Sequence, residues 1–154
     1  MCDEIRPFEE SDETAVLELW YRAGREAYVF LPSWQTLSLE SAHVIFFEEI
    51  LPGCELWVAT HGSQIVGYLA LKGSYIDRLY VDPSAQRKGW GTRLLNYVKT
   101  VQQCGLELHT HQQNNQARAF YEKHGFRAVK FGTSPPPESA PDVEYHWRPM
   151  RRCY

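Results

Sequence analysis

The chain has 154 residues, of which 44% are hydrophobic and 23% are charged, and its formal net charge at pH 7 is −3. These values are typical of one globular domain and exclude an intrinsically disordered chain. The negative charge balance argues against a general nucleic-acid binder, and no apolar run is long enough to cross a membrane. We therefore expect a single domain over residues 1–154, with neither nucleic acid nor membrane among its partners.

The cysteines lie far apart, and no two of them have the spacing of a metal or redox motif. We also recognise no secretory signal at the start of the chain. Reduced thiols in a cytoplasmic protein are therefore expected. The four residues are Cys2, Cys54, Cys104 and Cys153.

The first third of the chain predicts a short strand and two helices. Residues Cys2 to Pro7 have the pattern of a strand. An apolar stripe over residues 15–23 predicts a helix with Ser11 as its N-cap and an end near Gly24. A second helix is expected from Ser38 to Leu51, before Pro52-Gly53. Its inward residues would be Leu39, His43, Phe46, Phe47 and Ile50.

A hairpin and a strand–turn–helix unit follow. Residues Glu55 to Thr60 and Gln64 to Lys72 read as two strands joined by a tight turn at Gly62. Residues Ile76 to Val81 alternate as a third strand, and a turn begins at Asp82-Pro83. The apolar residues that recur at helical spacing beyond Gly89 are Trp90, Leu94, Leu95 and Val98.

The segment between that strand and that helix predicts an anion-binding turn. Gly89 and Gly91 stand at the start of the helix, where backbone N–H groups and the helix dipole favour a negative charge. Arg87 and Lys88 add positive charge beside them. The pattern is neither a P-loop, because the lysine precedes the glycines, nor a Rossmann fingerprint, because residue 94 is Leu. An ordinary βα turn with glycines for packing is the alternative.

The string V-D-P-S-A-Q-R-K-G-W-G-T over residues 81–92 resembles motif A of the GNAT acetyltransferase superfamily, whose members bind acetyl-CoA. It departs from the usual pattern at Arg87, where Gly is common, and at Trp90, where a smaller aliphatic residue is usual. A second string, N-x-x-A-x-x-F-Y-x-x-x-G-F over residues 114–126, resembles motif B of the same superfamily. The two motifs occur in the family's order.

The resemblance implies an α/β fold of mixed type. Its central sheet would have about seven mostly antiparallel strands, would splay into a V, and would be flanked by about four helices. The remaining expected strands are Leu106 to Thr110, Arg127 to Phe131 and Val143 to Trp147. The loop at Pro135–Pro137 would border the acceptor site as a lid or be a plain connection. Weak candidates for walls of the acceptor pocket are Tyr28, Phe30 and Trp34.

The resemblance also assigns the residues that bind acetyl-CoA. Backbone N–H groups from Arg87 to Thr92 would bind the pyrophosphate, and the open strand edge from Leu79 to Val81 would pair with the pantetheine amides. Asn114 would bind the pantetheine arm, cap the helix, or do both. The full set is Leu79, Tyr80, Val81, Gln86, Arg87, Lys88, Gly89, Trp90, Gly91, Thr92, Asn114, Ala117 and Tyr121.

Acetyl transfer to an amine also needs groups that move protons. Tyr121 matches the family tyrosine that protonates the leaving thiolate, although an aromatic residue that packs on the sheet would look the same. The attacking amine must be neutral, so a base or a water chain to a base is useful. Candidates on strand faces are Asp77, Glu107, His109 and His111. We favour His109, because histidine titrates nearest to neutral pH; a surface histidine is the alternative.

His109 and His111 lack an obvious third ligand, so no metal is expected. The leading hypothesis is an acetyl-CoA-dependent N-acetyltransferase that acts on a primary amine, either a small molecule or a protein lysine or N-terminus. A GNAT-fold module that binds CoA with little turnover, and a structural domain without a cofactor, are the alternatives. A homodimer is left open.

Overall fold

One mixed sheet of seven strands organises the protein, whose computed structural model describes residues 2–136 and 138–149. The spatial order is β1-β2-β3-β4-β5-β7-β6, and every neighbouring pair is antiparallel except β4 and β5. The strands are β1 Asp3–Pro7, β2 Glu55–His61, β3 Gln64–Lys72, β4 Tyr75–Val81, β5 Leu106–His111, β6 Arg127–Thr133 and β7 Pro141–Trp147.

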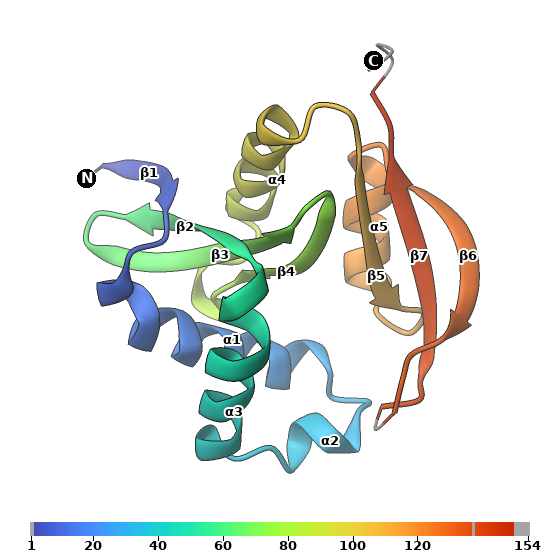
Figure 1. Ribbon diagram of the computed structural model, residues 1–154, viewed down its shortest axis with the longest axis horizontal. Helices are drawn as coiled ribbons and strands as arrows, with labels where there is room; N and C mark the ends of the chain where they lie inside the picture. The colour runs from blue at the N-terminus through green and yellow to red at the C-terminus, as the bar shows by residue number, and fades with distance from the viewer. Residues whose placement is uncertain (1, 137, 150–154) are drawn as a thin grey trace.

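The sheet splits between its two parallel strands. In the described structure, β4 and β5 share one residue pair, Tyr75 with Glu107, and the Glu107 N–H donates to the Ser74 carbonyl at 3.0 Å. Beyond that pair the two strands diverge, so that β1–β4 and β5–β7 form the two arms of a V (Figure 1). The divergence leaves the later residues of β4 without a strand partner on that side.

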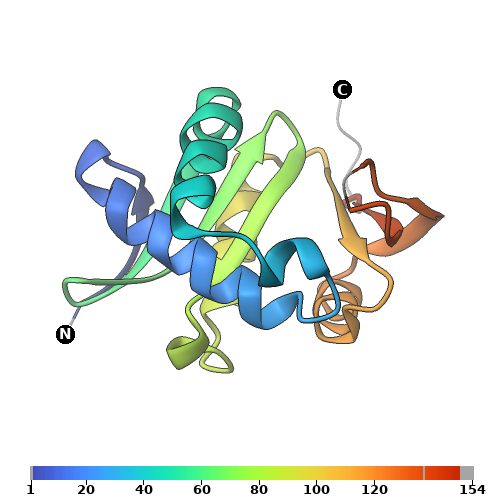
Figure 2. The same cartoon turned by 90° about the horizontal axis from the view of Figure 1, so that it is seen from below.

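Helices cover both faces of the sheet (Figures 1 and 2). Helix α1, Glu13–Ala27, and helix α3, Leu39–Ile45, pack on one face, and α3 continues as a π-helical turn over Phe46–Ile50. Helix α4, Trp90–Val101, and helix α5, Asn115–Lys123, pack on the other. The short helix α2, Pro32–Gln35, lies near the open side of the V. 3₁₀ turns cover Glu10–Asp12, Leu51–Gly53 and Pro83–Ala85.

The core is divided by the sheet into two apolar clusters. Because successive side chains of a strand point to opposite faces, Trp57 and Ala59 of β2 pack toward α4. Leu56 and Val58 of the same strand pack toward α1 and α3. Buried residues therefore run almost without interruption along β2 and β3, as expected of strands covered on both faces.

The predicted fold class is confirmed, including the V-shaped mixed sheet and its flanking helices. All seven expected strands are present, and the ends of most of them differ from expectation by one or two residues. The hairpin at Gly62, which adopts a φ of 62°, and the turn at Asp82 are also as predicted.

The first helix differs from expectation at both ends. Ser11 lies in the preceding 3₁₀ turn, and Asp12 occupies the N-cap position, where its carboxylate also pairs with Arg6 at 2.8 Å. The helix continues past Gly24 to Ala27, so this glycine does not end the helix. It instead leaves room for a neighbouring side chain. A Cβ atom at Gly24 would lie only 2.2 Å from the Trp34 ring.

The second helix is interrupted where one continuous helix was expected. Ser38 is the N-cap, accepting from the Ser41 N–H at 3.1 Å, but α3 gives way to the π turn after Ile45. Phe46 and Ile50 are buried as predicted, whereas Leu39 is 46% exposed and His43 is also exposed. The buried position in the first turns of α3 is instead Ala42.

The cysteines differ in state. Cys2 and Cys54 carry free thiols, whereas Cys104 is disulfide-bonded, so the expectation of reduced thiols is wrong for Cys104. Among the described residues, no helix combines the length and apolar character needed to span a membrane.

We predict that Gly24→Ala destabilises the protein. Alanine is normally favoured over glycine inside a helix by about 1 kcal/mol. Here the added methyl group would overlap the buried Trp34 ring, and overpacking of this kind costs about 1–3 kcal/mol. Urea denaturation should therefore show a lower free energy of unfolding, with Glu18→Ala on the exposed side of α1 as the control. A more stable Gly24→Ala variant would show that Trp34 can move aside at little cost.

Candidate active site

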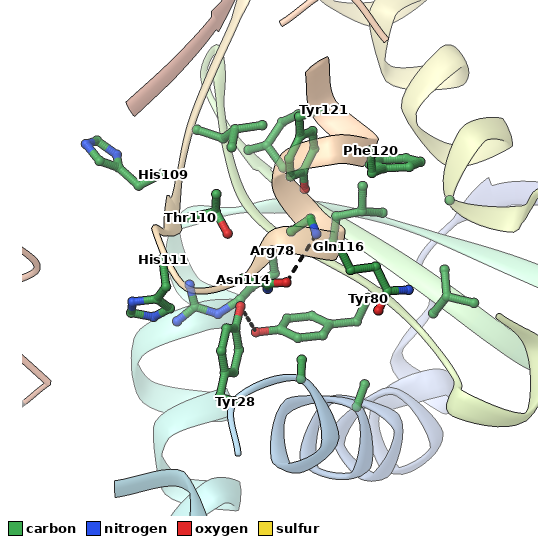
Figure 3. A pocket seen from close by; sticks show the side chains of 18 of the residues that line it. Tyr28, Arg78, Tyr80, His109, Thr110, His111, Asn114, Gln116, Phe120 and Tyr121 are labelled. Atoms are coloured by element: carbon green, nitrogen blue, oxygen red, sulfur yellow. Dashed lines mark hydrogen bonds between the residues drawn. The ribbon is translucent and has the colours of Figure 1, made fainter. Parts of the chain in front are cut away.

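A cleft of about 970 Å³ occupies the split between β4 and β5. Its walls come from elements far apart in the sequence: the end of α1 with Tyr28, strands β4 and β5, the start of α4, and α5. Figure 3 shows the side chains that converge on it. The cleft therefore exists because the parallel strands separate, and each arm of the V supplies one wall.

A bulge in β4 sets the direction of the side chains that follow it. Ala70 and Leu71 of β3 pair with Arg78 and Ile76, which leaves Asp77 as the extra residue. Bulges of this kind re-aim side chains near functional sites. Arg78 and Tyr80 consequently face the same side of the sheet as α1, while Leu79 and Val81 pack toward α4.

The mouth of the cleft at α4 has the backbone of an anion cradle. Arg87 and Gly89 have φ values of 65° and 85°, and no atom lies within 4 Å of where a Gly89 Cβ would be. The first backbone hydrogen bond into α4 runs from the Arg93 N–H to the Gly89 carbonyl at 3.0 Å. Amide groups of the preceding helical residues therefore have no acceptor within the helix. Such amides are suited to bind a phosphate.

Two aromatic residues, Trp90 and Phe120, pack beside this cradle. A Cβ at Gly91 would approach the Phe120 ring to 3.3 Å, so glycine allows α4 and α5 to lie close together. The Trp90 side chain is 6% exposed and packs in the core below the mouth. Arg93 covers its ring at 4.6 Å, and His61 meets it edge-on. The bulky indole is thus accommodated by core packing.

Asn114 caps α5 at the edge of the cleft. Its Oδ1 accepts from the Ala117 N–H at 3.1 Å, drawn as a dashed line in Figure 3. Both Asn114 and Ala117 line the cleft. The side-chain amide N–H₂ of Asn114 remains available as a donor, because the cap uses the oxygen.

Tyr121 projects from α5 into the cleft. The residue is 8% exposed, and its ring packs against Phe120 at 5.2 Å and Phe126 at 5.4 Å. In Figure 3 its hydroxyl points toward the interior of the cleft. Burial, together with the nearby Tyr80 and Tyr75, raises the pKa of Tyr121 above its ordinary value. The phenol therefore stays protonated near neutral pH and can donate a proton.

The opposite end of the cleft is aromatic and holds a contact between His111 and Glu138. Tyr28 packs against His111 with a ring separation of 5.2 Å, and its hydroxyl lies 3.5 Å from that of Tyr80. His111 Nε2 lies 3.3 Å from a Glu138 carboxylate oxygen in the β6–β7 loop. The hydrogen bond from His111 lowers the pKa of Glu138. This contact ties the loop to β5 within the same arm of the V.

His109 lies on the outer margin of the cleft. Its Nδ1 is 2.9 Å from the Tyr75 hydroxyl, and its Nε2 is 3.4 Å from Glu144. In Figure 3 the ring is turned away from the Tyr121 hydroxyl. Any proton exchange between His109 and the cleft would therefore pass through Tyr75 or through water. Within the described ranges, no group of three or more His, Cys, Asp or Glu side chains could hold a metal ion.

Most residues singled out from the sequence line this cleft, whereas Phe30, Lys88 and Glu107 do not. Pro135 also lines it, whereas Pro137 lies outside the described residues. Sequence reasoning missed Tyr75, Arg78 and Glu138, which no local motif marks. The predicted residues that line the cleft are Tyr28, Trp34, Asp77, Leu79, Tyr80, Val81, Gln86, Arg87, Gly89, Trp90, Gly91, Thr92, His109, His111, Asn114, Ala117 and Tyr121.

Comparison with known proteins agrees with this geometry. A family model for the acetyltransferase (GNAT) domain matches residues 52–128, which is half of the chain. The peptidyl-lysine N-acetyltransferase YjaB of Salmonella typhimurium is 30% identical over 130 residues, which cover 84% of this chain and 86% of that protein. The YjaB protein of Escherichia coli is 31% identical over 84% of this chain and 85% of its own length.

Solved structures show the same fold. The solution structure of apo YjaB from Escherichia coli superposes with a TM-score of 0.78 at 25% identity, covering 96% of this chain and 98% of that one. The PaiA N-acetyltransferase of Thermoplasma acidophilum, solved in complex with coenzyme A, has a TM-score of 0.72 at 22% identity, covering 96% and 99%. With a V-shaped sheet, a glycine-bearing helix mouth and a cleft-facing tyrosine, the chain belongs to the GNAT family and is an N-acetyltransferase.

Proposed function

We propose that the protein transfers the acetyl group of acetyl-CoA to the ε-amino group of a lysine in a peptide or protein. The observation that carries the proposal is the single cleft that joins the α4 mouth to the Tyr121 hydroxyl. In that cleft a pyrophosphate-binding mouth and a proton donor would share one channel. The lysine acceptor is supported by the similarity to peptidyl-lysine N-acetyltransferases.

The donor would be held mainly by backbone groups. Amides from Arg87 to Thr92 would bind its pyrophosphate, because the glycines and the helix dipole favour an anion there. The unpaired edge of β4 from Leu79 to Val81 would pair with the amides of the pantetheine arm as an added strand does. The Asn114 amide would donate to the same arm.

Two proton transfers would accompany the reaction. A lysine amine with a pKa of about 10.4 must lose a proton before attack, which costs about 4–5 kcal/mol at pH 7. We assign that proton to His109, through the Tyr75 hydroxyl to which His109 Nδ1 is bonded, or through water. The Val81 N–H would donate a hydrogen bond to the carbonyl oxygen of the acetyl thioester. Tyr121 would protonate the departing thiolate.

The proposal is tested by thiol release from acetyl-CoA with three classes of acceptor. These are a lysine peptide with a blocked N-terminus, a peptide with a free N-terminus but no lysine, and small polyamines. We expect release with the lysine peptide and a mass increase located on its lysine. Thermal stabilisation by CoA without thiol release in any arm would instead identify a binding module.

Tyr121→Phe should lower kcat by about a hundredfold, because loss of a general acid typically costs 10²–10⁴-fold. Affinity for CoA, measured by calorimetry, should change far less, since the ring still packs against Phe120 and Phe126. Tyr97→Phe, at a partly exposed tyrosine on α4 that does not line the cleft, is the matched control. Equal losses of kcat and CoA affinity would reassign Tyr121 to binding.

The pH dependence of kcat follows from the raised pKa of Tyr121. The protonated phenol is the active form, and it persists up to a pH above the ordinary tyrosine value of about 10. Protonation of Tyr121 should therefore not limit kcat between pH 7 and pH 9.5. A fall in kcat with an apparent pKa below 9 would exclude Tyr121 as the proton donor.

A further inference from the structure

An arginine on β4 lines the end of the cleft that lies opposite the α4 mouth. Arg78 follows the bulge at Asp77 and lines the cleft together with Tyr28, Tyr80 and Glu138. Its side chain is 34% exposed, and Figure 3 shows it extended within the cleft in the direction of Tyr28. The α4 mouth lies toward the other end of β4, beyond Val81. The guanidinium is therefore separate from the expected pyrophosphate cradle.

The hydrogen-bonding capacity of this guanidinium is largely unused by the described residues. Arg78 Nη1 donates to the Asp77 carbonyl at 2.8 Å, and the same atom lies 3.4 Å from the Asp77 carboxylate. No other described residue forms an ion pair or a hydrogen bond with the guanidinium. A guanidinium carries five N–H donors in a planar fork, and the contacts with Asp77 use only Nη1.

The surroundings keep this group charged. Burial disfavours the charged form, but the nearby Tyr80 and Asp77 outweigh it, and the pKa of Arg78 is raised. Tyr28, Tyr68 and Tyr80 lie near the group, so the wall around it is aromatic. Charge-assisted hydrogen bonds are strengthened in such surroundings.

The nearest acidic groups do not satisfy Arg78. Glu138 faces the same end of the cleft, but its carboxylate is engaged by His111 at 3.3 Å. Asp77 makes one long contact from the neighbouring position in the chain, without the two parallel hydrogen bonds of a bidentate pair. A cation that keeps its fork open toward a substrate cleft is suited to bind a planar anion.

From this arrangement we infer that Arg78 binds a carboxylate on the acceptor, close to the amine that is acetylated. The inference rests on the proposed function and narrows its substrate class to lysines with a carboxylate nearby. Two sources share this chemistry: the α-carboxylate of the lysine itself and the side chain of an adjacent Glu or Asp.

Matched carboxylate and carboxamide acceptors test the inference on the wild-type protein. One pair is Nα-acetyl-lysine and Nα-acetyl-lysine amide. The second pair is a blocked peptide with Glu next to its lysine and the same peptide with Gln there. We expect kcat/KM to be about 10- to 100-fold higher for the carboxylate member of one pair, as for a hydrogen bond between charged groups. The pair that shows the difference identifies the source.

Substitutions then assign the effect to Arg78. Arg78→Gln should bring the carboxylate-to-carboxamide ratio close to one, and Arg78→Lys, which keeps the charge but loses the fork, should give an intermediate ratio. CoA should stabilise both variants as it does the wild type. Arg127→Gln, on the exposed strand β6, should keep the wild-type ratio.

The outcomes separate this inference from the proposed function. Acetylation of lysine with equal kcat/KM for both members of each pair would overturn the role of Arg78 and leave the proposed function intact. A preference that survives in Arg78→Gln would also overturn it, as would faster reaction of the carboxamides. No acetylation of any lysine acceptor would instead remove the proposed function, and the inference with it.

Discussion

The single residue pair between β4 and β5 is the constraint on which the site depends. A parallel pair that continued along both strands would satisfy the backbone groups of β4 and close the sheet. Because pairing stops after Tyr75 and Glu107, the remaining edge of β4 faces a cleft. On their other sides both strands remain paired, β4 with β3 and β5 with β7, each in antiparallel register. The protein therefore keeps an open strand edge inside a folded sheet.

The cleft has a gradient of chemical character along β4. At the α4 end, backbone geometry dominates: Arg87 and Gly89 adopt positive φ values and the helix begins with free amides. In the middle, Tyr121 supplies a buried phenol. At the far end, an aromatic wall holds the charged Arg78. Backbone groups are suited to bind acetyl-CoA, which is the donor in every reaction cycle. Side chains at the far end can discriminate between acceptors.

Tight packing behind the cleft keeps its walls in place. Trp34 fills the space over Gly24, stacks on Tyr28 at 5.6 Å and meets Trp20 edge-on at 5.2 Å. Tyr28 in turn contacts His111 on the opposite arm of the V. The aromatic loop between α1 and α3 thus connects the core of one arm to the surface of the other. Aromatic pairs of this kind add about 0.5–1.5 kcal/mol beyond the area they bury.

Local sequence determined the strands, the glycine turn at residue 89 and the cap at Asn114, because each depends on neighbours within a few positions. It also marked the residues of the cleft at the start of α4 and along α5, since two compact motifs carry them. Tertiary structure decided the rest. The local sequence predicts a helix end at Gly24, but the Trp34 ring packs against this glycine and the helix continues. The local sequence also predicts that Leu39 is buried, whereas α3 packs on the sheet with Leu39 exposed. Arg78 stands in an ordinary alternating strand, and only the bulge at Asp77 and the missing β5 partner turn it toward the cleft. Such features depend on contacts between segments far apart in the chain, which no local pattern records.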